Sequence, residues 1–283
     1  MLDFKKYTKP FLIAEIGINH NGNLQIVKKL IDASFACSWD CVKFQKKNPD
    51  ISVPEDQKNI LKQTPWGEMT YLAYKKKLEF KKEEYDYIDR YCREKPINWS
   101  FSVWDMDSLN FAMEYELPFL KIPSAHLTNI ELITEAAKTK IPLILSTGMS
   151  TLDEIDAAVE LLEKHANQYV LMHCNASYPA RNDELNLLVI PKMIERYKCV
   201  VGYSGHEYGL DSTTIAVSLG AMVIERHITI DHTMWGTDQS SSIEPQGMDK
   251  LFKQVNSVKS YLGDGIKRVY DSEKAVMKKL RIF

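Results

Sequence analysis

The stretch that decides the fold runs from Cys199 to Asp238 and reads CVVGYSGHEYGLDSTTIAVSLGAMVIERHITIDHTMWGTD. Two short apolar runs flank a helix-like segment, which is typical of parallel strands buried on both faces. His206 lies just past the first run and His227 lies at the end of the second. Neighbouring parallel strands lie about 5 Å apart. We therefore expect the two imidazoles at one edge of the sheet, close enough to bind the same metal ion.

The same alternation of a short apolar run and a helical pattern continues through the chain. Further runs with strand character precede the opening stretch, and together they predict eight strands, at 11–17, 41–45, 98–104, 119–124, 142–147, 169–174, 199–204 and 221–228. Strands that alternate with helices indicate a parallel sheet covered by helices, and eight such units predict a closed barrel. The expected fold class is α/β, a single (β/α)8 TIM barrel.

We assign residues 1–266 to the barrel. Residues 46–80 interrupt the rhythm with three prolines and a cluster of charges, and they predict an excursion over the barrel mouth with a short helix near 69–78. The tail at 267–283 is basic and too poor in apolar residues for a second domain. We expect it to pack on the barrel or on a partner subunit.

The composition narrows the class of protein. The 283 residues carry a formal net charge of −2, which gives no electrostatic indication of a nucleic-acid or membrane partner. No run approaches 18 apolar residues, and the N-terminus lacks an apolar signal segment. Five cysteines, an odd number without a CxxC pair, favour reduced and buried thiols. These features predict a cytoplasmic protein.

Polar residues gather where the predicted strands end, which is the position of the active site in barrels of this kind. Lys43 and Lys121 both interrupt apolar strands, although a buried charge costs several kcal/mol unless it is paired. One interpretation is an internal ion pair, for example between Glu15 and Lys43. The other is an anion site, in which the two lysines and nearby hydroxyls hold a phosphate and a carboxylate together; the hydroxyls are those of Ser124, Ser146, Thr147 and Ser204.

His206 and His227 also allow two interpretations. They are either hydrogen-bonded polar histidines or ligands of a borderline divalent ion such as Mn²⁺ or Zn²⁺. The sequence shows no third strong protein ligand beside them. A metal there would keep open coordination positions, which suits a Lewis acid acting on a carbonyl oxygen.

Seven motifs in order resemble the N-acetylneuraminate (sialic acid) synthase family. They are AEIGINHNG at 14–22, VKFQ at 42–45, LKIPS at 120–124, ILSTGMS at 144–150, HCNASYP at 173–179, GYSGH at 202–206 and ERHIT at 225–229. The match extends over nearly the whole predicted barrel. MWGTDQ at 234–239 is similar to a subgroup of short synthases, and we expect the chain to lack the family's C-terminal antifreeze-like domain.

The resemblance implies a condensation of phosphoenolpyruvate with an aldose, typically N-acetylmannosamine. The product is a nine-carbon 2-keto-3-deoxy sugar acid such as N-acetylneuraminate, and phosphate is released. The family further implies a homodimer and a bound Mn²⁺, with Mg²⁺, Co²⁺ or Zn²⁺ as other possible ions. The alternative is a synthase that uses a related acceptor and makes an acid of the legionaminate, pseudaminate or octulosonate type. A less favoured alternative is a sugar-phosphate-binding barrel without catalysis.

The resemblance also implies roles for individual residues. It places phosphoenolpyruvate against Lys43, Lys121, Ser124, Ser146 and Ser204, and the metal on His206 and His227. It places the sugar against Glu15, Gln45, Tyr178 and Asp238, with proton transfer open between Glu15 and Asp238. Ser102 and Trp104 stand where the family usually has a threonine and an aromatic residue.

Two substitutions depart from the family pattern. His126 stands where many members have an acid, which leaves the activation of the attacking water open. Ala176 stands where the family has an asparagine, and the adjacent Asn175 is the predicted substrate contact in its place.

Overall fold

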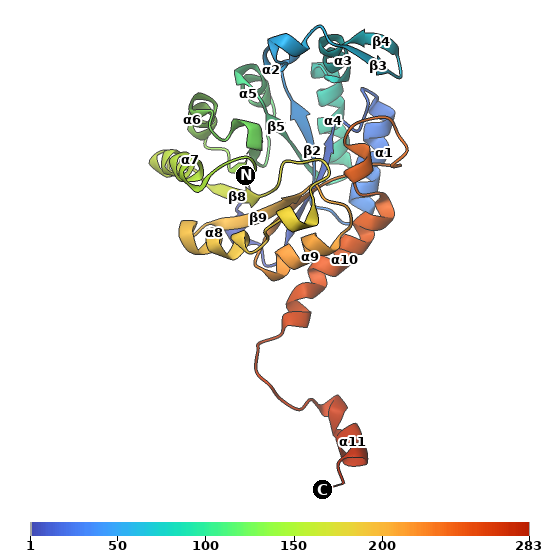
Figure 1. The fold of residues 1–283 in the computed structure, drawn as a ribbon, viewed down its shortest axis with the longest axis vertical. Coiled ribbons are helices and arrows are strands. Elements are labelled where there is room, and N and C mark those ends of the chain that lie inside the picture. Colours follow the sequence, from blue (N-terminus) through green and yellow to red (C-terminus); the bar gives the residue numbers. More distant parts are fainter. Residues whose placement is uncertain (1, 283) are drawn as a thin grey trace.

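The computed structural model describes residues 2–282, and its centre is a closed barrel of eight strands (Figure 1). Around the barrel the order is β1-β10-β9-β8-β7-β6-β5-β2, and every neighbouring pair is parallel. The strands are β1 (Phe11–Gly17), β2 (Cys41–Lys46), β5 (Asn98–Val103), β6 (Leu120–Ile122), β7 (Leu143–Ser146), β8 (Tyr169–His173), β9 (Val200–Gly205) and β10 (Val223–His227). The predicted (β/α)8 fold is confirmed.

Helices follow the strands and cover the outside of the barrel (Figure 1). They are α1 (Leu24–Ala36), α4 (Lys82–Glu94), α5 (Met106–Ala112), α6 (Ile130–Lys138), α7 (Leu152–Lys164), α8 (Val189–Tyr197), α9 (Asp211–Ser218) and α10 (Pro245–Leu262). The eight predicted strands all form. The fourth is shorter than 119–124 because Pro123 has no N–H to donate and Ser124 begins a 3-10 turn.

The barrel interior is divided into an apolar and a polar part. Alternate residues of each strand point inward, and those near the strand starts, such as Phe11, Ile13 and Val223, form one apolar cluster. Phe4, in a 3-10 turn at Phe4–Lys6, packs its ring 5.4 Å from that of Phe11 and closes this end. Two residues further along the strands, the inward positions become charged or polar. The apolar end therefore stabilises the barrel, and the opposite end carries the polar groups.

The excursion at 46–80 has more structure than the sequence indicates. It contains α2 (Pro49–Ser52), a hairpin of β3 (Leu61–Thr64) and β4 (Gly67–Thr70), and α3 (Tyr71–Leu78). The short helix is confirmed near its predicted position. The hairpin was not predicted, because its strands, LKQT and GEMT, are largely exposed and lack alternating apolar residues.

The excursion packs against the loop after β10. The rings of Trp66 and Tyr74 lie 6.2 Å and 5.2 Å from that of Trp235. These aromatic contacts hold the hairpin and α3 against the loop that follows β10.

The C-terminal tail does not pack on the barrel. Its helix α11 (Asp271–Leu280) stands apart from the barrel at the end of an extended segment (Figure 1). Residues 267–282 are exposed, except that Met277 is half-buried. One of the two predicted placements of the tail is thus wrong for the described residues, and packing on a partner subunit stays a prediction. None of the helices in residues 2–282 combines the length and apolar character that a membrane crossing requires.

Candidate active site

A polar cavity opens at the carboxyl ends of the barrel strands, with about 600 Å³ of free space. All predicted site residues line it except Asn175, Asp238 and Thr147, whose hydroxyl instead donates to the Met172 carbonyl oxygen at 3.0 Å. The predicted residues in its wall are Glu15, Lys43, Gln45, Ser102, Trp104, Lys121, Ser124, Ser146, Tyr178, Ser204, His206 and His227. Strand register explains this, because Glu15 on β1 lies opposite both Lys43 on β2 and His227 on β10.

Two buried ion pairs form the floor of the cavity. Lys43 Nζ lies 2.5 Å from Glu15 Oε2, and Lys121 Nζ donates a hydrogen bond of 2.6 Å to Glu225 Oε1. Lys43 Nζ is also 3.7 Å from Glu225 Oε1, which joins the two pairs into one network. The expected internal ion pair between Glu15 and Lys43 is therefore present. It does not exclude the anion site, because both ammonium groups face the cavity.

Burial and charge set the pKa values in this network. Burial raises the pKa of Glu15 to about 7, although Lys43 opposes the shift and Glu225 adds to it. Burial alone would raise the pKa of Glu225 as well, but Lys121 and Lys43 together lower it. Glu225 thus stays ionised between the lysines, whereas Glu15 is the carboxyl that can take up a proton near neutral pH.

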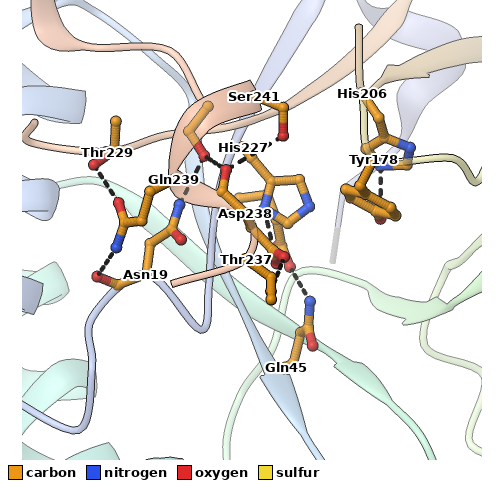
Figure 2. A network of polar contacts seen from close by, with 12 residues as sticks. Asn19, Gln45, Tyr178, His206, His227, Thr229, Thr237, Asp238, Gln239 and Ser241 are labelled. Carbon is orange, nitrogen blue, oxygen red and sulfur yellow. Dashed lines mark hydrogen bonds and ion pairs between the residues drawn. The ribbon is translucent and has the colours of Figure 1, made fainter. Parts of the chain in front are cut away.

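The two predicted metal ligands lie side by side. Their ring centroids are 5.6 Å apart, and both rings face Tyr178 (Figure 2). Burial lowers the pKa of His206 to about 4, with a further contribution from the positive charge that His227 would carry. Burial also lowers the pKa of His227. Both imidazoles are therefore neutral at physiological pH, which is the form that binds metals.

The donor set fits a divalent ion with two protein nitrogens. His206 Nδ1 lies 2.7 Å from the Asn175 carbonyl oxygen, which orients the ring, and the Tyr178 hydroxyl lies 2.9 Å from Nε2. A metal at Nε2 would replace this last contact. His227 Nδ1 is buried without a hydrogen-bond partner. Within residues 2–282, no cluster of three or more His, Cys, Asp or Glu side chains is arranged to hold a metal, so an ion here would keep open positions for water and substrate.

Asp238 and Asn175 lie outside the cavity wall for different reasons. Asp238 Oδ2 is 4.0 Å from His227 Nδ1, so its carboxylate stands beside the two histidines at the rim (Figure 2). The Asn175 side chain instead accepts a hydrogen bond from the Ser177 N–H and donates one to the Glu184 carbonyl. These loop hydrogen bonds hold the Asn175 side chain out of the cavity wall, and its predicted substrate contact stays a prediction. Its backbone carbonyl supports His206.

Hydrogen bonds to the first strand's loop fix the segment that carries Asp238. Gln239 donates to the Asn19 carbonyl at 3.2 Å and accepts from the Thr229 hydroxyl (Figure 2). Asn19 Nδ2 donates to Ser242 Oγ at 2.7 Å, and Ser242 Oγ donates to the Asp238 carbonyl at 2.6 Å. These contacts tie the 229–242 loop to β1.

A third buried ion pair, missed in the sequence, lies behind the histidines. Arg226 Nη1 is 3.0 Å from Glu207 Oε1, and both side chains are at most 1% exposed. Glu207 follows His206 and Arg226 precedes His227, so the pair joins the two strand ends. The signal in the sequence was a second charge, Arg226, in the apolar run at 221–228. The same run also contains Glu225, the partner of Lys121.

The fold and the cavity define a (β/α)8 barrel with a polar ligand site built from buried lysines, hydroxyls and two neutral histidines at the carboxyl ends of its strands. The chain belongs to the NeuB family, whose model matches residues 30–267.

Similar proteins cover most of the chain. It is 33% identical over 273 residues to the N-acetylneuraminate-9-phosphate synthase of Homo sapiens, covering 95% of this chain and 76% of that protein. It is 35% identical over 270 residues to the N,N'-diacetyllegionaminic acid synthase of Campylobacter jejuni, covering 94% and 81%. The crystal structure of the N-acetylneuraminic acid (sialic acid) synthetase from Leptospira borgpetersenii, in complex with citrate, superposes with a TM-score of 0.85 at 30% identity, covering 96% and 91%. These matches support the resemblance read from the motifs.

Proposed function

We propose that this protein is an enzyme that makes a 3-deoxy-2-keto sugar acid. It condenses phosphoenolpyruvate with an aldose of the N-acetylmannosamine type to a nine-carbon acid such as N-acetylneuraminate, and it releases phosphate. The observation that carries the proposal is the placement of Lys43 and Lys121 at the cavity floor, among hydroxyls and beside two neutral histidines. The names of the similar synthases support the class of product.

Phosphoenolpyruvate carries a carboxylate and a phosphate on one small frame, and the cavity floor suits both. The two ammonium groups would hold the anion, and hydroxyls in the cavity wall would complete its hydrogen bonds. These hydroxyls are those of Ser102, Ser124, Ser146 and Ser204. Fixing the substrate in this way presents its C3 carbon toward the mouth, where the second substrate enters.

The reaction balances with one water. C3 of phosphoenolpyruvate attacks the aldehyde carbon, and positive charge develops at C2. Water adds to C2, and phosphate leaves by cleavage of the C2–O bond. Glu15 or Asp238 would take up and return the protons of the water and the sugar. Gln45, whose Nε2 donates to Glu15 Oε1 at 3.1 Å, orients the Glu15 carboxylate, and Tyr178 would contact the sugar.

We also propose a divalent metal cofactor, Mn²⁺ in the first place, with Mg²⁺, Co²⁺ or Zn²⁺ as alternatives. His206 and His227 would hold it, and when bound it would polarise the aldehyde oxygen. A homodimer and a cytoplasmic location complete the proposal. Sedimentation of the full chain would test the homodimer. Fractionation of the native cells would test the cytoplasmic location.

The direct test is phosphate release from phosphoenolpyruvate in the presence of Mn²⁺ and a panel of aldoses. We expect release with an acylated amino-hexose and formation of the corresponding 2-keto acid. Release only with a different aldose would replace the N-acetylmannosamine type by a legionaminate, pseudaminate or octulosonate type of acceptor. If none of the aldoses supports phosphate release, the protein would be a sugar-phosphate-binding barrel, and the enzyme proposal would be contradicted.

A further inference from the structure

The ends of three neighbouring barrel strands meet at one point beside the cavity. Ser124 lies just after β6, Gly148 just after β7 and Cys174 directly after β8. Ser124 and Cys174 both line the cavity, and Cys174 is only 6% exposed. Ser124 belongs to the proposed anion site, whereas Cys174 has no role in the proposed reaction.

Two groups of the protein contact the Ser124 hydroxyl. The Gly148 N–H donates to Ser124 Oγ at 3.1 Å, and Cys174 Sγ lies 3.1 Å from the same oxygen. Within residues 2–282, Ser124 Oγ has no other hydrogen-bond partner. A hydroxyl has one hydrogen to donate and two lone pairs that accept. The Gly148 contact uses one lone pair, so the hydrogen and the second lone pair remain for Cys174 and a ligand.

A bound anion decides which of the two takes the hydrogen. Either atom can be the donor in the contact between Ser124 and Cys174 when no anion is bound. Sulfur is a weak acceptor, whereas an ionised oxygen accepts a much stronger hydrogen bond. In the presence of an anion the Ser124 O–H therefore turns to that anion, and the Cys174 S–H donates to the lone pair that remains on Ser124 Oγ.

We infer that Cys174 is a positioning residue for phosphoenolpyruvate. Its thiol donates to Ser124 Oγ and thereby directs the Ser124 O–H toward the anion of the substrate. Cys174 acts through Ser124 and does not itself have to touch the reacting atoms. This inference rests on the proposed function.

Other hydroxyls of the cavity wall are oriented by charged groups. Ser102 Oγ accepts a hydrogen bond of 2.8 Å from Lys43 Nζ, and Ser204 Oγ donates one of 3.4 Å to Glu225 Oε1. At Ser124 a thiol and a backbone N–H take that part. Removing the thiol therefore changes the orientation of one hydroxyl without removing a charge from the cavity.

Close packing keeps the three groups together. A Cβ atom at position 148 would lie 2.9 Å from both Ser124 Oγ and Cys174 Sγ, and 3.3 Å from the Cys174 carbonyl oxygen. A side chain at this position would push the hydroxyl and the thiol out of place. The close approach explains why a glycine stands between them.

Calorimetric titration of phosphoenolpyruvate into the full chain, without an aldose, tests the inference. We expect the Kd to rise about three- to tenfold in Cys174→Ala, because the thiol no longer directs the Ser124 O–H. Cys174→Ser keeps a donor in the same place and should restore most of the affinity. Cys92→Ala makes the same change at a buried position of α4 outside the cavity wall, and it is the matched control. It should leave the Kd unchanged.

A double-mutant cycle with Ser124→Ala separates positioning from a structural role. The group through which Cys174 acts is absent from Ser124→Ala, so adding Cys174→Ala to it should have no further effect on the Kd. A structural role of Cys174 would instead weaken binding by the same factor in both backgrounds, and this result would overturn the inference.

The same titrations distinguish the inference from the proposed function. Phosphoenolpyruvate that binds to Cys174→Ala as tightly as to the wild type would refute the role of the thiol and leave the proposed function standing. If the wild type does not bind phosphoenolpyruvate, the proposed function is wrong, and the inference falls with it.

Discussion

Lys121 and Glu225 lie 104 residues apart in the chain, yet Lys121 Nζ donates a 2.6 Å hydrogen bond to Glu225 Oε1 inside the barrel. At most 6% of either side chain is exposed. The cation that the proposed reaction needs is thus already paired with an anion. An incoming phosphate or carboxylate has to share Lys121 with Glu225, and both the stability and the ligand affinity of the protein depend on this pair.

A mutant cycle on this pair separates the two effects. Lys121→Met leaves the buried Glu225 charge unpaired, and we expect a loss of about 3–5 kcal/mol in the free energy of unfolding. Adding Glu225→Gln should restore most of that stability without restoring phosphoenolpyruvate binding. Denaturant unfolding and calorimetric titration measure the two quantities. If the double variant binds phosphoenolpyruvate as tightly as the wild type, Lys121 is not part of an anion site.

The paired histidines predict a loss of metal in two single variants. His206→Ala and His227→Ala each remove one of the two protein nitrogens, so bound Mn²⁺ measured by elemental analysis should fall well below that of the wild type, together with turnover. His165→Ala, at the end of α7 and away from the cavity, is the control and should retain both. Normal metal content in both of the first variants would refute the two-histidine site.

The raised pKa of Glu15 predicts how stability changes with pH. Its pKa is about 7 in the folded protein, against an ordinary value of 4.5 for this side chain. Between these values the folded state holds the proton more tightly than the unfolded chain, so this carboxyl lowers stability as the pH rises from 4.5 to 7. The full effect is at most about 3 kcal/mol.

Glu15→Gln removes that titration. The free energy of unfolding of the variant, measured at pH 5 and at pH 7, should therefore decrease less over this interval than that of the wild type. An unchanged difference between the two pH values would mean that Glu15 ionises in its ordinary range.

The buried Arg226–Glu207 pair predicts a large stability effect at a position outside the cavity wall. Arg226→Met leaves Glu207 charged and buried at 0% exposure, and we expect a loss of about 3–5 kcal/mol in the free energy of unfolding. Arg196→Met breaks a partly exposed pair with Asp156 and should cost less than about 1 kcal/mol. Similar losses in the two variants would show that the inner pair is not buried as described.

Much of the barrel could be predicted from the sequence because each strand is a short apolar run bounded by helical patterns. Lys43 and Lys121 were recognisable for the same reason, since a charge in such a run has to be compensated. The pairing of Lys121 with Glu225 was not recognisable, because it depends on which strands face each other across the closed barrel.

Two further features required the structure. The β3–β4 hairpin consists of exposed polar residues, so no apolar period marks it. The direction of the Asn175 side chain depends on hydrogen bonds within one loop, to Ser177 and Glu184. Motif position alone placed that side chain in the cavity, whereas local hydrogen bonding decides its orientation.

The excursion between β2 and α4 has a consequence for how this protein can change. Its hairpin and α3 form a self-contained insert that reaches the mouth without contributing a strand to the closed barrel. An insert of this kind can be lengthened, shortened or exchanged while the apolar end of the barrel, closed by Phe4, keeps folding as before. The segment at the mouth and the folding of the barrel can in this sense change independently, and exchanging residues 46–80 between relatives would test whether this insert influences the choice of sugar.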